Sequence, residues 1–307
     1  MKKPVSTYFH RISLVQFGIT LLSIGAFGIA SAQPPANIQA TSWMIIDGES
    51  GQTLLEHNAD AERQPASLTK LMTAYIVLDA LKRGTLHWNE TVVVSAADIS
   101  DVGNDEAQMY LAPGQRVQIK DLVQGLIVAS ANDAAHVLAE RVGGTLPNFE
   151  QEMNKTARRL GMTHTHYSTP SGITTPGNYS TARDLATLAI RLTKDFPEYY
   201  SYSSVQNFAY GKFHKRNKNW LLGMDPSVDG LKTGHTQAAG YCIVATAKRK
   251  QTNPPVTRRV FAVVLGAPTA QKRISSAEQL LNYAFSSFKD YPVSSGSGHR
   301  LVTRSTF

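Results

Sequence analysis

The hydrophobic positions of this chain follow a strand-like pattern near both ends and a helical pattern between them. Near the beginning, residues 42–46 and 52–58 are two short strand candidates that flank turn-forming residues at 47–51, which predicts a β-hairpin. Towards the other end, residues 241–247 and 259–265 are apolar, β-branched runs of strand length. Apolar positions recur at helical spacing in residues 67–83, 120–129, 133–142, 146–160, 182–194 and 270–287.

This order of elements predicts an α+β fold. The N- and C-terminal strands are expected to pair in one antiparallel sheet, with a helical subdomain inserted between them. The 307 residues are 42% hydrophobic and 18% charged. These values are typical of globular proteins and make a disordered chain, a coiled coil or a polytopic membrane protein poor fits.

The first 32 residues have the pattern of a secretory signal peptide. Lys2, Lys3 and Arg11 precede an apolar stretch at 12–30, and Ala30-Ser31-Ala32 is a small-residue cleavage site. An uncleaved membrane anchor is the alternative, although several glycines weaken the stretch as a spanning helix. We predict cleavage after Ala32 and export to the bacterial periplasm.

Cleavage would leave 275 residues and lower the formal net charge from +8 to +5. The densest basic stretch is residues 212–218, and Arg258-Arg259 is a smaller pair. Export and the lack of a recognisable nucleic-acid module argue against nucleic acid as a partner. We interpret the basic charge as a solvated face or as general attraction to an anionic cell envelope, with at most a weak, peripheral association with the inner membrane.

The sequence offers no convincing metal or cofactor motif. Cys242 is the only cysteine, which excludes a disulfide within the chain and a cysteine-based metal cluster. No His-Glu-x-x-His or phosphate loop occurs, and the His164-x-His166 pair has no carboxylate at ligand spacing. We therefore expect no metal and no cofactor.

Three short motifs could carry chemistry. Ser67-Leu68-Thr69-Lys70 places a hydroxyl and an amine on one face of a helix start, Ser130-Ala131-Asn132 lies at a break between two helices, and Lys232-Thr233-Gly234 opens a strand. Taken singly, each has an ordinary structural explanation: a helix cap, turn residues and an edge-strand lysine. Together and in this order, they resemble the motif set of penicillin-binding proteins and class A β-lactamases, with Ala131 where aspartate is usual.

Further segments extend this resemblance to the D-alanyl-D-alanine carboxypeptidases, low-molecular-mass penicillin-binding proteins of serine peptidase family S11. These segments are Pro65–Lys70, Ser130–Ala134, Leu160–Met162, Tyr179–Asp184 and Val228–Thr236. The resemblance runs from about residue 37 to residue 288. It implies the DD-peptidase fold, in which a five-stranded antiparallel sheet flanked by helices carries an inserted all-helical subdomain.

The resemblance also implies a domain division and one departure from the family. We expect a signal peptide at 1–32, a catalytic domain at 33–288 and a short flexible tail at 289–307. Larger members continue into a β-rich second domain and an amphipathic membrane-anchoring helix, whereas this chain ends at Phe307 after a Gly/Ser-rich, basic tail. A shortened or single-domain form is therefore expected, without firm membrane attachment.

The resemblance assigns acyl transfer to the first and third motifs. Ser67 is expected to be the nucleophile, and Lys70 the base that activates it. An ordinary lysine pKa is near 10.4, so that of Lys70 would have to fall to roughly 7–8 for this task. Burial and a second cation, Lys232, would supply that shift, and the two lysines would titrate as a coupled pair.

The other motif residues are expected to bind the substrate. By resemblance, Ser130 relays a proton to the leaving D-alanine, and Asn132 holds the substrate backbone. Lys232 and Thr233 suit a terminal carboxylate, and Gly234 lets the strand approach the substrate closely. The backbone N–H groups of Ser67 and His235 would form the oxyanion hole.

Three rival functions share parts of the pattern. A D,D-endopeptidase, which cuts peptidoglycan cross-links, has the same motifs and a compact length. A class A β-lactamase needs a deacylating glutamate, but Glu150 lies within an amphipathic helix and is better explained as structural. A non-enzymatic penicillin sensor would not require the complete motif set. The preferred function is a serine carboxypeptidase that removes the terminal D-alanine from peptidoglycan stem peptides and is inhibited by β-lactams.

Overall fold

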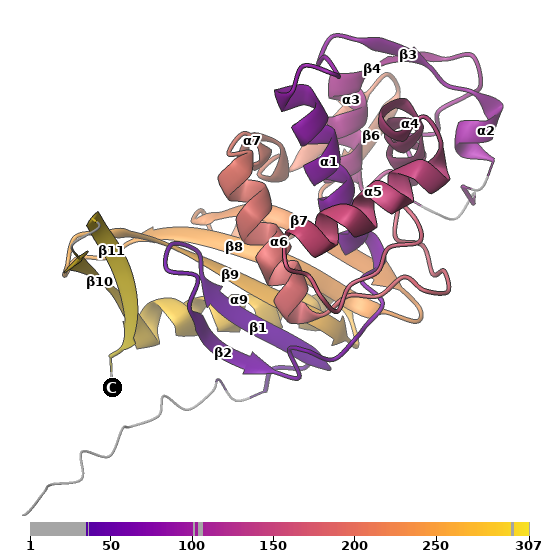
Figure 1. Cartoon of the computed structure of the whole chain (residues 1–307). Coiled ribbons are helices and arrows are strands. Elements are labelled where there is room, and N and C mark those ends of the chain that lie inside the picture. The colour runs from indigo at the N-terminus through magenta and orange to yellow at the C-terminus, as the bar shows by residue number, and fades with distance from the viewer. Residues whose placement is uncertain (1–34, 36, 101, 104–106, 296–297, 307) are drawn as a thin grey trace, which may run out of the picture. The chain divides into compact units, whose positions relative to one another are not determined.

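The computed structural model describes residues 35, 37–100, 102–103, 107–295 and 298–306 (Figure 1). All of them belong to one compact unit spanning Ala32–Thr306. The predicted signal peptide, 1–32, lies outside the described residues. Within the described ranges, no helix has both the length and the apolar character needed to span a bilayer.

A five-stranded antiparallel sheet forms the base of the fold and confirms the predicted fold class. Its strand order is β2-β1-β9-β8-β7, so the first two strands pair with the last three through β1 and β9. The strands are β1 (Ser42–Asp47), β2 (Thr53–His57), β7 (Val228–Thr236), β8 (Gly240–Lys250) and β9 (Thr257–Ala267). Sequence patterns placed Lys232 at a strand start, but β7 begins four residues earlier, at Val228.

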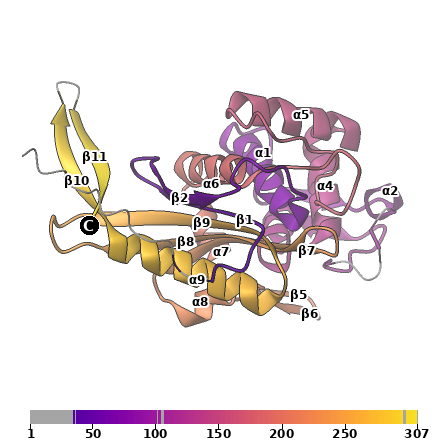
Figure 2. The same ribbon diagram turned by 90° about the horizontal axis from the view of Figure 1, so that it is seen from below.

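Both faces of the sheet are covered, and side chains alternate between them. Met44 and Ile46 pack in the core with the inserted helices, whereas Trp43 and Ile45 pack in a second core against α9 (Ala270–Ser287). Figure 2 shows α9 lying along one face of the sheet, while α1, α4, α5 and α6 lie on the opposite side. Burial on both faces explains why the inner strands are almost uniformly apolar.

The insertion between β2 and β7 is mainly helical, and parts of it pack against β7, the last strand of the sheet. Its helices are α1 (Lys70–Lys82), α2 (Ala96–Ile99), α3 (Ile119–Gln124), α4 (Asn132–Gly143), α5 (Leu146–Arg159), α6 (Ala182–Asp195), α7 (Tyr199–Ser203) and α8 (Leu221–Met224). It is not all-helical as expected, because it also contains two small antiparallel strand pairs. These are β3–β4 (Thr91–Val93, Arg116–Gln118), whose strands are separated by α2, and the hairpin β5–β6 (Asn207–Tyr210, Phe213–Arg216). Strands of three or four residues are too short to show a period in sequence.

The segment expected to be a flexible tail contains a β-hairpin. Strand β10 (Phe288–Ser295) pairs with β11 (Gly298–Ser305). Asp290 on β10 is buried and contacts the buried Arg258 of β9 (Nε–Oδ1, 3.0 Å), which also contacts Asp47 at the end of β1 (Nη2–Oδ2, 3.3 Å). This ion cluster attaches the hairpin to the sheet.

Candidate active site

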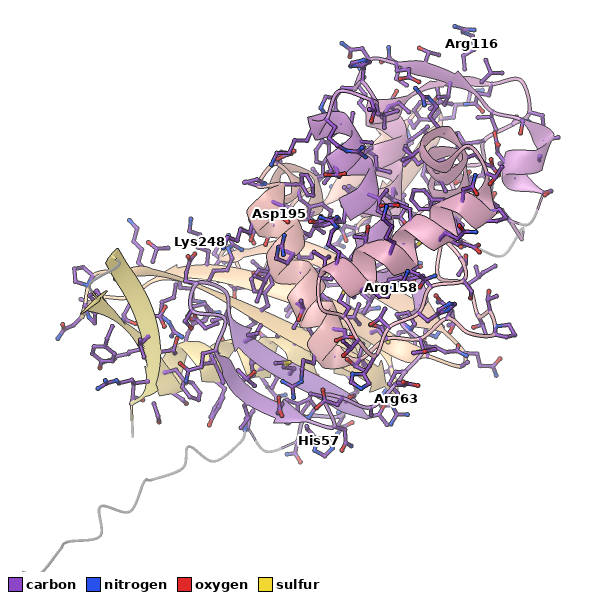
Figure 3. The ribbon with its side chains drawn as sticks, viewed as in Figure 1. His57, Arg63, Arg116, Arg158, Asp195 and Lys248 are labelled. Atoms are coloured by element: carbon purple, nitrogen blue, oxygen red, sulfur yellow. The ribbon has the colours of Figure 1, made fainter. Side chains whose placement is uncertain are left out.

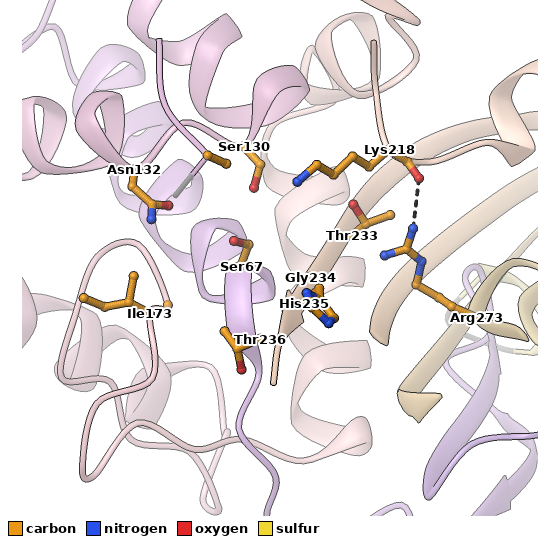
Figure 4. A pocket seen from close by; sticks show the side chains of 12 residues that line it. Ser67, Ser130, Asn132, Ile173, Lys218, Thr233, Gly234, His235, Thr236 and Arg273 are labelled. Carbon is orange, nitrogen blue, oxygen red and sulfur yellow. Dashed lines mark hydrogen bonds between the residues drawn. The ribbon is translucent and has the colours of Figure 1, made fainter. Parts of the chain in front are cut away.

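Ser67 lies on a tight turn of helix directly before α1. Residues Ala66–Thr69 form a 3₁₀-helix that continues into α1 at Lys70, so the predicted single helix 67–83 is two helices of different pitch. Ala66 adopts φ +48° and turns the chain into this helix. Ser67 is half-buried and faces a pocket of about 220 Å³ (Figure 4).

Lys70 lies beneath Ser67 with its amine almost completely enclosed. Its side chain is 1% exposed, and Nζ donates hydrogen bonds to Ser67 Oγ (3.1 Å), Asn132 Oδ1 (2.6 Å) and the Ser171 carbonyl (2.5 Å). The Ser171 carbonyl belongs to a loop that Thr73 also holds, through its bond to the Pro170 carbonyl (2.6 Å). The amine is therefore fixed in position against the Ser67 hydroxyl.

Ser130 and Asn132 come from a sharp break between two helical segments. A π-helix at Gly125–Ala129 ends on Ser130, which adopts the left-handed conformation (φ +62°, ψ +33°), and α4 begins at Asn132. This break turns the Ser130 hydroxyl towards the pocket, where Figure 4 shows it near Ser67. A left-handed non-glycine residue costs conformational energy and persists where the surrounding structure imposes it.

Lys232 brings the third motif to Ser130. Its Nζ donates to Ser130 Oγ (2.8 Å) and to the Thr233 carbonyl (2.9 Å), and its side chain is 4% exposed. Burial and repulsion from Lys70 lower the pKa of Lys232 well below that of an ordinary lysine, and Lys218 and Arg273 lower it further. The two Ser–Lys pairs, Ser67–Lys70 and Ser130–Lys232, are thus electrostatically coupled.

Two glycines allow the walls of the pocket to approach the Ser67 turn. A Cβ on Gly234 would lie 3.0 Å from the Pro65 carbonyl oxygen and 3.1 Å from the Ser67 backbone nitrogen. A Cβ on Gly172, which has φ +80°, would overlap the Ala66 carbonyl at 2.0 Å. Only glycine fits at these two positions without displacing the backbone that carries Ser67.

The structure brings all eight predicted residues together. Ser67, Ser130, Asn132, Thr233, Gly234 and His235 line the pocket, and Lys70 and Lys232 bond to two of its hydroxyls. Burial lowers the pKa of His235, with Arg273 and Lys218 adding repulsion, and its ring lies 4.0 Å from that of Tyr241.

Lys218 and Arg273 also line the pocket, although sequence reasoning did not select them (Figure 4). Arg273 is buried on the first turn of α9, where desolvation lowers its pKa to about 10, and its Nη2 donates to the Lys218 carbonyl (3.1 Å). Lys218 belongs to the basic stretch that was interpreted as a solvated face. No local pattern marks either residue, because they meet the pocket only through the pairing of distant elements.

The pocket can therefore supply a hydroxyl with an adjacent amine, a second hydroxyl–amine pair and an excess of positive charge. The cations of Lys218, Lys232 and Arg273 suit a carboxylate, and the Ser–Lys pairs suit acyl transfer. Among the residues that the structure describes, no group of His, Cys, Asp and Glu is arranged to hold a metal ion.

Known proteins are similar to this chain in sequence and in architecture. Residues 29–269 match the family model described as D-alanyl-D-alanine carboxypeptidase. The chain is 35% identical to the D-alanyl-D-alanine carboxypeptidase DacA of Haemophilus influenzae, over 92% of this chain and 72% of that protein. It is 38% identical to DacC of Escherichia coli, over 86% of this chain and 66% of that protein.

Solved structures agree with these matches. Penicillin-binding protein 5 from H. influenzae superimposes with a TM-score of 0.84 at 33% identity, covering 89% of this chain and 85% of the other. Penicillin-binding protein D2 from Listeria monocytogenes, in its cefotaxime-bound form, gives a TM-score of 0.74 at 34% identity, covering 82% and 100%. With its Ser–Lys pocket and these similarities, the chain belongs to the D-alanyl-D-alanine carboxypeptidase family, the low-molecular-mass penicillin-binding proteins of peptidase family S11.

Proposed function

We propose that this protein is a serine-type D-Ala-D-Ala carboxypeptidase that acts on peptidoglycan stem peptides through an acyl-enzyme on Ser67. The observation that carries this proposal is the contact between Lys70 Nζ and Ser67 Oγ at 3.1 Å, inside a pocket that opens beside Ser67. A free serine hydroxyl is a weak nucleophile, and a buried amine within hydrogen-bond reach can remove its proton.

The acylation step uses both Ser–Lys pairs. In its neutral form, with its two N–H bonds directed to Asn132 and the Ser171 carbonyl, Lys70 accepts the hydroxyl proton as Ser67 Oγ attacks the carbonyl carbon of the penultimate D-alanine. The C–N bond then breaks, and the amine of the terminal D-alanine receives a proton through the Ser130 hydroxyl, which Lys232 contacts. Water subsequently hydrolyses the Ser67 ester and releases the shortened peptide.

Binding of the substrate accounts for the remaining residues. The terminal carboxylate would lie among Lys232, Thr233, Lys218 and Arg273, and the Asn132 amide would orient the peptide backbone. The backbone N–H groups of Ser67 and His235 would hold the oxyanion, and the fit of Gly234 against the Ser67 nitrogen keeps these two segments adjacent. Removing one such donor typically costs roughly 100- to 1,000-fold in rate.

The same pocket would accept β-lactams, whose carboxylate and strained amide present the same groups. The sequence features of export support a periplasmic location, reached through a signal peptide at 1–32, where peptidoglycan is accessible. The modest positive charge supports no more than a peripheral association with the membrane surface.

Incubation with pentapeptide muropeptides and with cross-linked dimers, followed by mass spectrometry, tests this function. We expect the loss of one terminal alanine from the pentapeptide and no product from Ser67→Ala. Cleavage of dimers without loss of terminal alanine would identify an endopeptidase instead. Rapid hydrolysis of penicillin over many turnovers, in place of a stable acyl-enzyme, would identify a β-lactamase.

A further inference from the structure

The hairpin β5–β6 carries a cluster of cations that the proposed chemistry does not use. Lys212, Lys215 and Arg216 are all solvent-exposed. Within the described part of the chain, none of the ion pairs includes Lys212, Lys215 or Arg216. By contrast, the arginines of the sheet, Arg249, Arg258 and Arg259, each pair with an aspartate.

This hairpin adjoins the pocket. It packs against the π-helix Gly125–Ala129 that ends at Ser130, and the chain leaves it directly into Lys218, which lines the pocket. The Lys218 amine points into the pocket (Figure 4), and loss of water around it lowers its pKa. Repulsion from Lys215 and Arg273 lowers that pKa further, which places the charge of Lys215 within electrostatic range of the substrate site.

An exposed aromatic ring lies next to these cations. Tyr110 is 65% exposed, and its ring meets that of Phe213 on β6 edge to face, with centroids 5.8 Å apart. Its backbone is held at φ +60°, because the N–H groups of Met109 and Leu111 on either side both donate to the buried Asp133 carboxylate (2.9 and 3.0 Å). The ring is therefore held at the surface by the helix α4 that also carries Asn132.

We infer that Lys212, Lys215, Arg216 and Tyr110 form an exosite for polymeric peptidoglycan, which engages the anionic polymer around the stem peptide being cleaved. The cations match the free carboxylates of neighbouring stem peptides, and the tyrosine face matches the apolar face of a sugar ring. This inference rests on the proposed function, because the pocket beside the hairpin takes a substrate that is attached to that polymer.

The test compares two triple variants of equal charge change. Lys212→Gln, Lys215→Gln and Arg216→Gln neutralise the exosite. Lys248→Gln, Lys250→Gln and Lys289→Gln remove three other exposed cations that form no ion pair with the described residues, as the matched control. Lys248 lies at the far end of β8, near the C-terminal hairpin (Figure 3), and Lys250 is about 26 Å along the strand from the residue that faces Gly234.

Binding is measured by co-sedimentation of Ser67→Ala proteins with purified insoluble peptidoglycan at low and at high salt. We expect the exosite variant to bind roughly tenfold more weakly at low ionic strength, the control to bind as the parent, and the difference to disappear in about 0.5 M salt. Tyr110→Ala should weaken the binding that persists at high salt. Equal losses in both triple variants, or no loss in the exosite variant, would overturn the inference.

Two parallel measurements separate this inference from the proposed function and from another partner. The rate of acylation by penicillin, with Ser67 present, reports on the pocket alone. A parent protein that is neither acylated nor active would refute the proposed function, whereas an active parent with an unaffected exosite variant would refute only the exosite. If the substitutions reduced binding to anionic phospholipid vesicles but not to peptidoglycan, the surface would be a membrane site and the inference would be wrong.

Discussion

At the scale of single residues, the pocket concentrates positive charge that burial makes costly. Lys70 and Lys232 are both almost fully enclosed, and Arg273 is buried nearby. Burial and the charges of Lys70, Lys218 and Arg273 lower the pKa of Lys232, and such crowding of cations is the arrangement that a lysine base requires. The site roles of the serine, lysine and asparagine residues in the three motifs could be predicted from sequence, because these residues lie at the spacing of a known motif set. Lys218 and Arg273 could not, because their roles depend on which distant elements meet.

The lowered pKa of Lys232 predicts a pH effect on substrate binding. As pH rises through that pKa, Lys232 loses the charge that attracts a terminal carboxylate, so the KM of a free-acid peptide should rise about tenfold at a pH where ordinary lysines remain charged. A peptide with an amidated C-terminus lacks this partner, and its KM should change little. Steady-state kinetics from pH 6 to 10 on both peptides would check this, and parallel KM profiles would exclude the carboxylate role.

The close approach of Gly234 predicts a sharp steric effect. In Gly234→Ala, the new methyl group would press on the Pro65 carbonyl and the Ser67 nitrogen, so acylation by penicillin should slow by at least roughly tenfold. Gly223→Ala is the matched control, because a Cβ there meets nothing closer than 3.7 Å. Stopped-flow acylation rates compare the two, and equal rates would show that β7 does not position Ser67.

At the scale of elements, helix starts and breaks place the reactive groups. The apolar periods of α5, α6 and α9 were predictable because each of these helices buries one face in a core. Helices α1 and α4 are buried on all sides over much of their length, and their long runs of helix-forming apolar residues made them predictable. The 3₁₀ turn at Ser67 and the π-helix before Ser130 were not, because a local change of helical pitch leaves no signature in hydrophobic spacing. Tertiary contacts impose these irregular turns, and they occur where the chemistry is expected.

The first turn of α4 depends on one buried carboxylate. Asp133 accepts backbone N–H bonds from Met109, Leu111 and Ala134, so Asp133→Asn would lose acceptors and place an amide donor against other donors. We expect the free energy of unfolding to fall by about 1–3 kcal/mol in a urea titration. Asp121→Asn, in the first turn of α3, is the control and should change it by less than about 0.5 kcal/mol. Equal stability of the two variants would contradict this role of Asp133.

At the scale of the whole molecule, the sheet joins the two ends of the sequence, and the ion cluster of Asp47, Arg258 and Asp290 attaches the last hairpin to it. The pairing of β1 with β9 could be predicted, because buried apolar strands at both ends of a chain need a common sheet. The hairpin β10–β11 could not, since its Gly/Ser-rich sequence is typical of a tail. Its attachment depends on Arg258, a buried charge that hydrophobic patterns do not reveal.

The cluster also predicts how stability depends on pH. Burial and repulsion from Asp47 raise the pKa of Asp290 above its usual 3.8, so the folded state holds this proton more tightly than the unfolded chain does. The protonated Asp290 side chain therefore contributes to the stability of the folded state. This contribution is complete below pH 3.8 and is lost as the pH rises through the raised pKa. Asp290→Asn removes the titrating group and should abolish this decrease of stability with rising pH. The free energy of unfolding of the wild type, relative to that of the variant, should therefore decrease from pH 4 to pH 7. Urea unfolding measures this difference, and an increase of the difference from pH 4 to pH 7 would contradict a raised pKa of Asp290.

The central claim is that the Ser67 hydroxyl, activated by Lys70, is the nucleophile of a D-Ala-D-Ala carboxypeptidase. The most direct measurement is mass spectrometry of the purified protein and of a D-Ala-D-Ala-terminated pentapeptide after incubation, with penicillin as a trap in a second sample. The account predicts release of one D-alanine, a penicillin adduct on the peptide that contains Ser67, and neither product in Ser67→Ala. Release of D-alanine by Ser67→Ala at the wild-type rate, or an adduct on another serine such as Ser286, would contradict it.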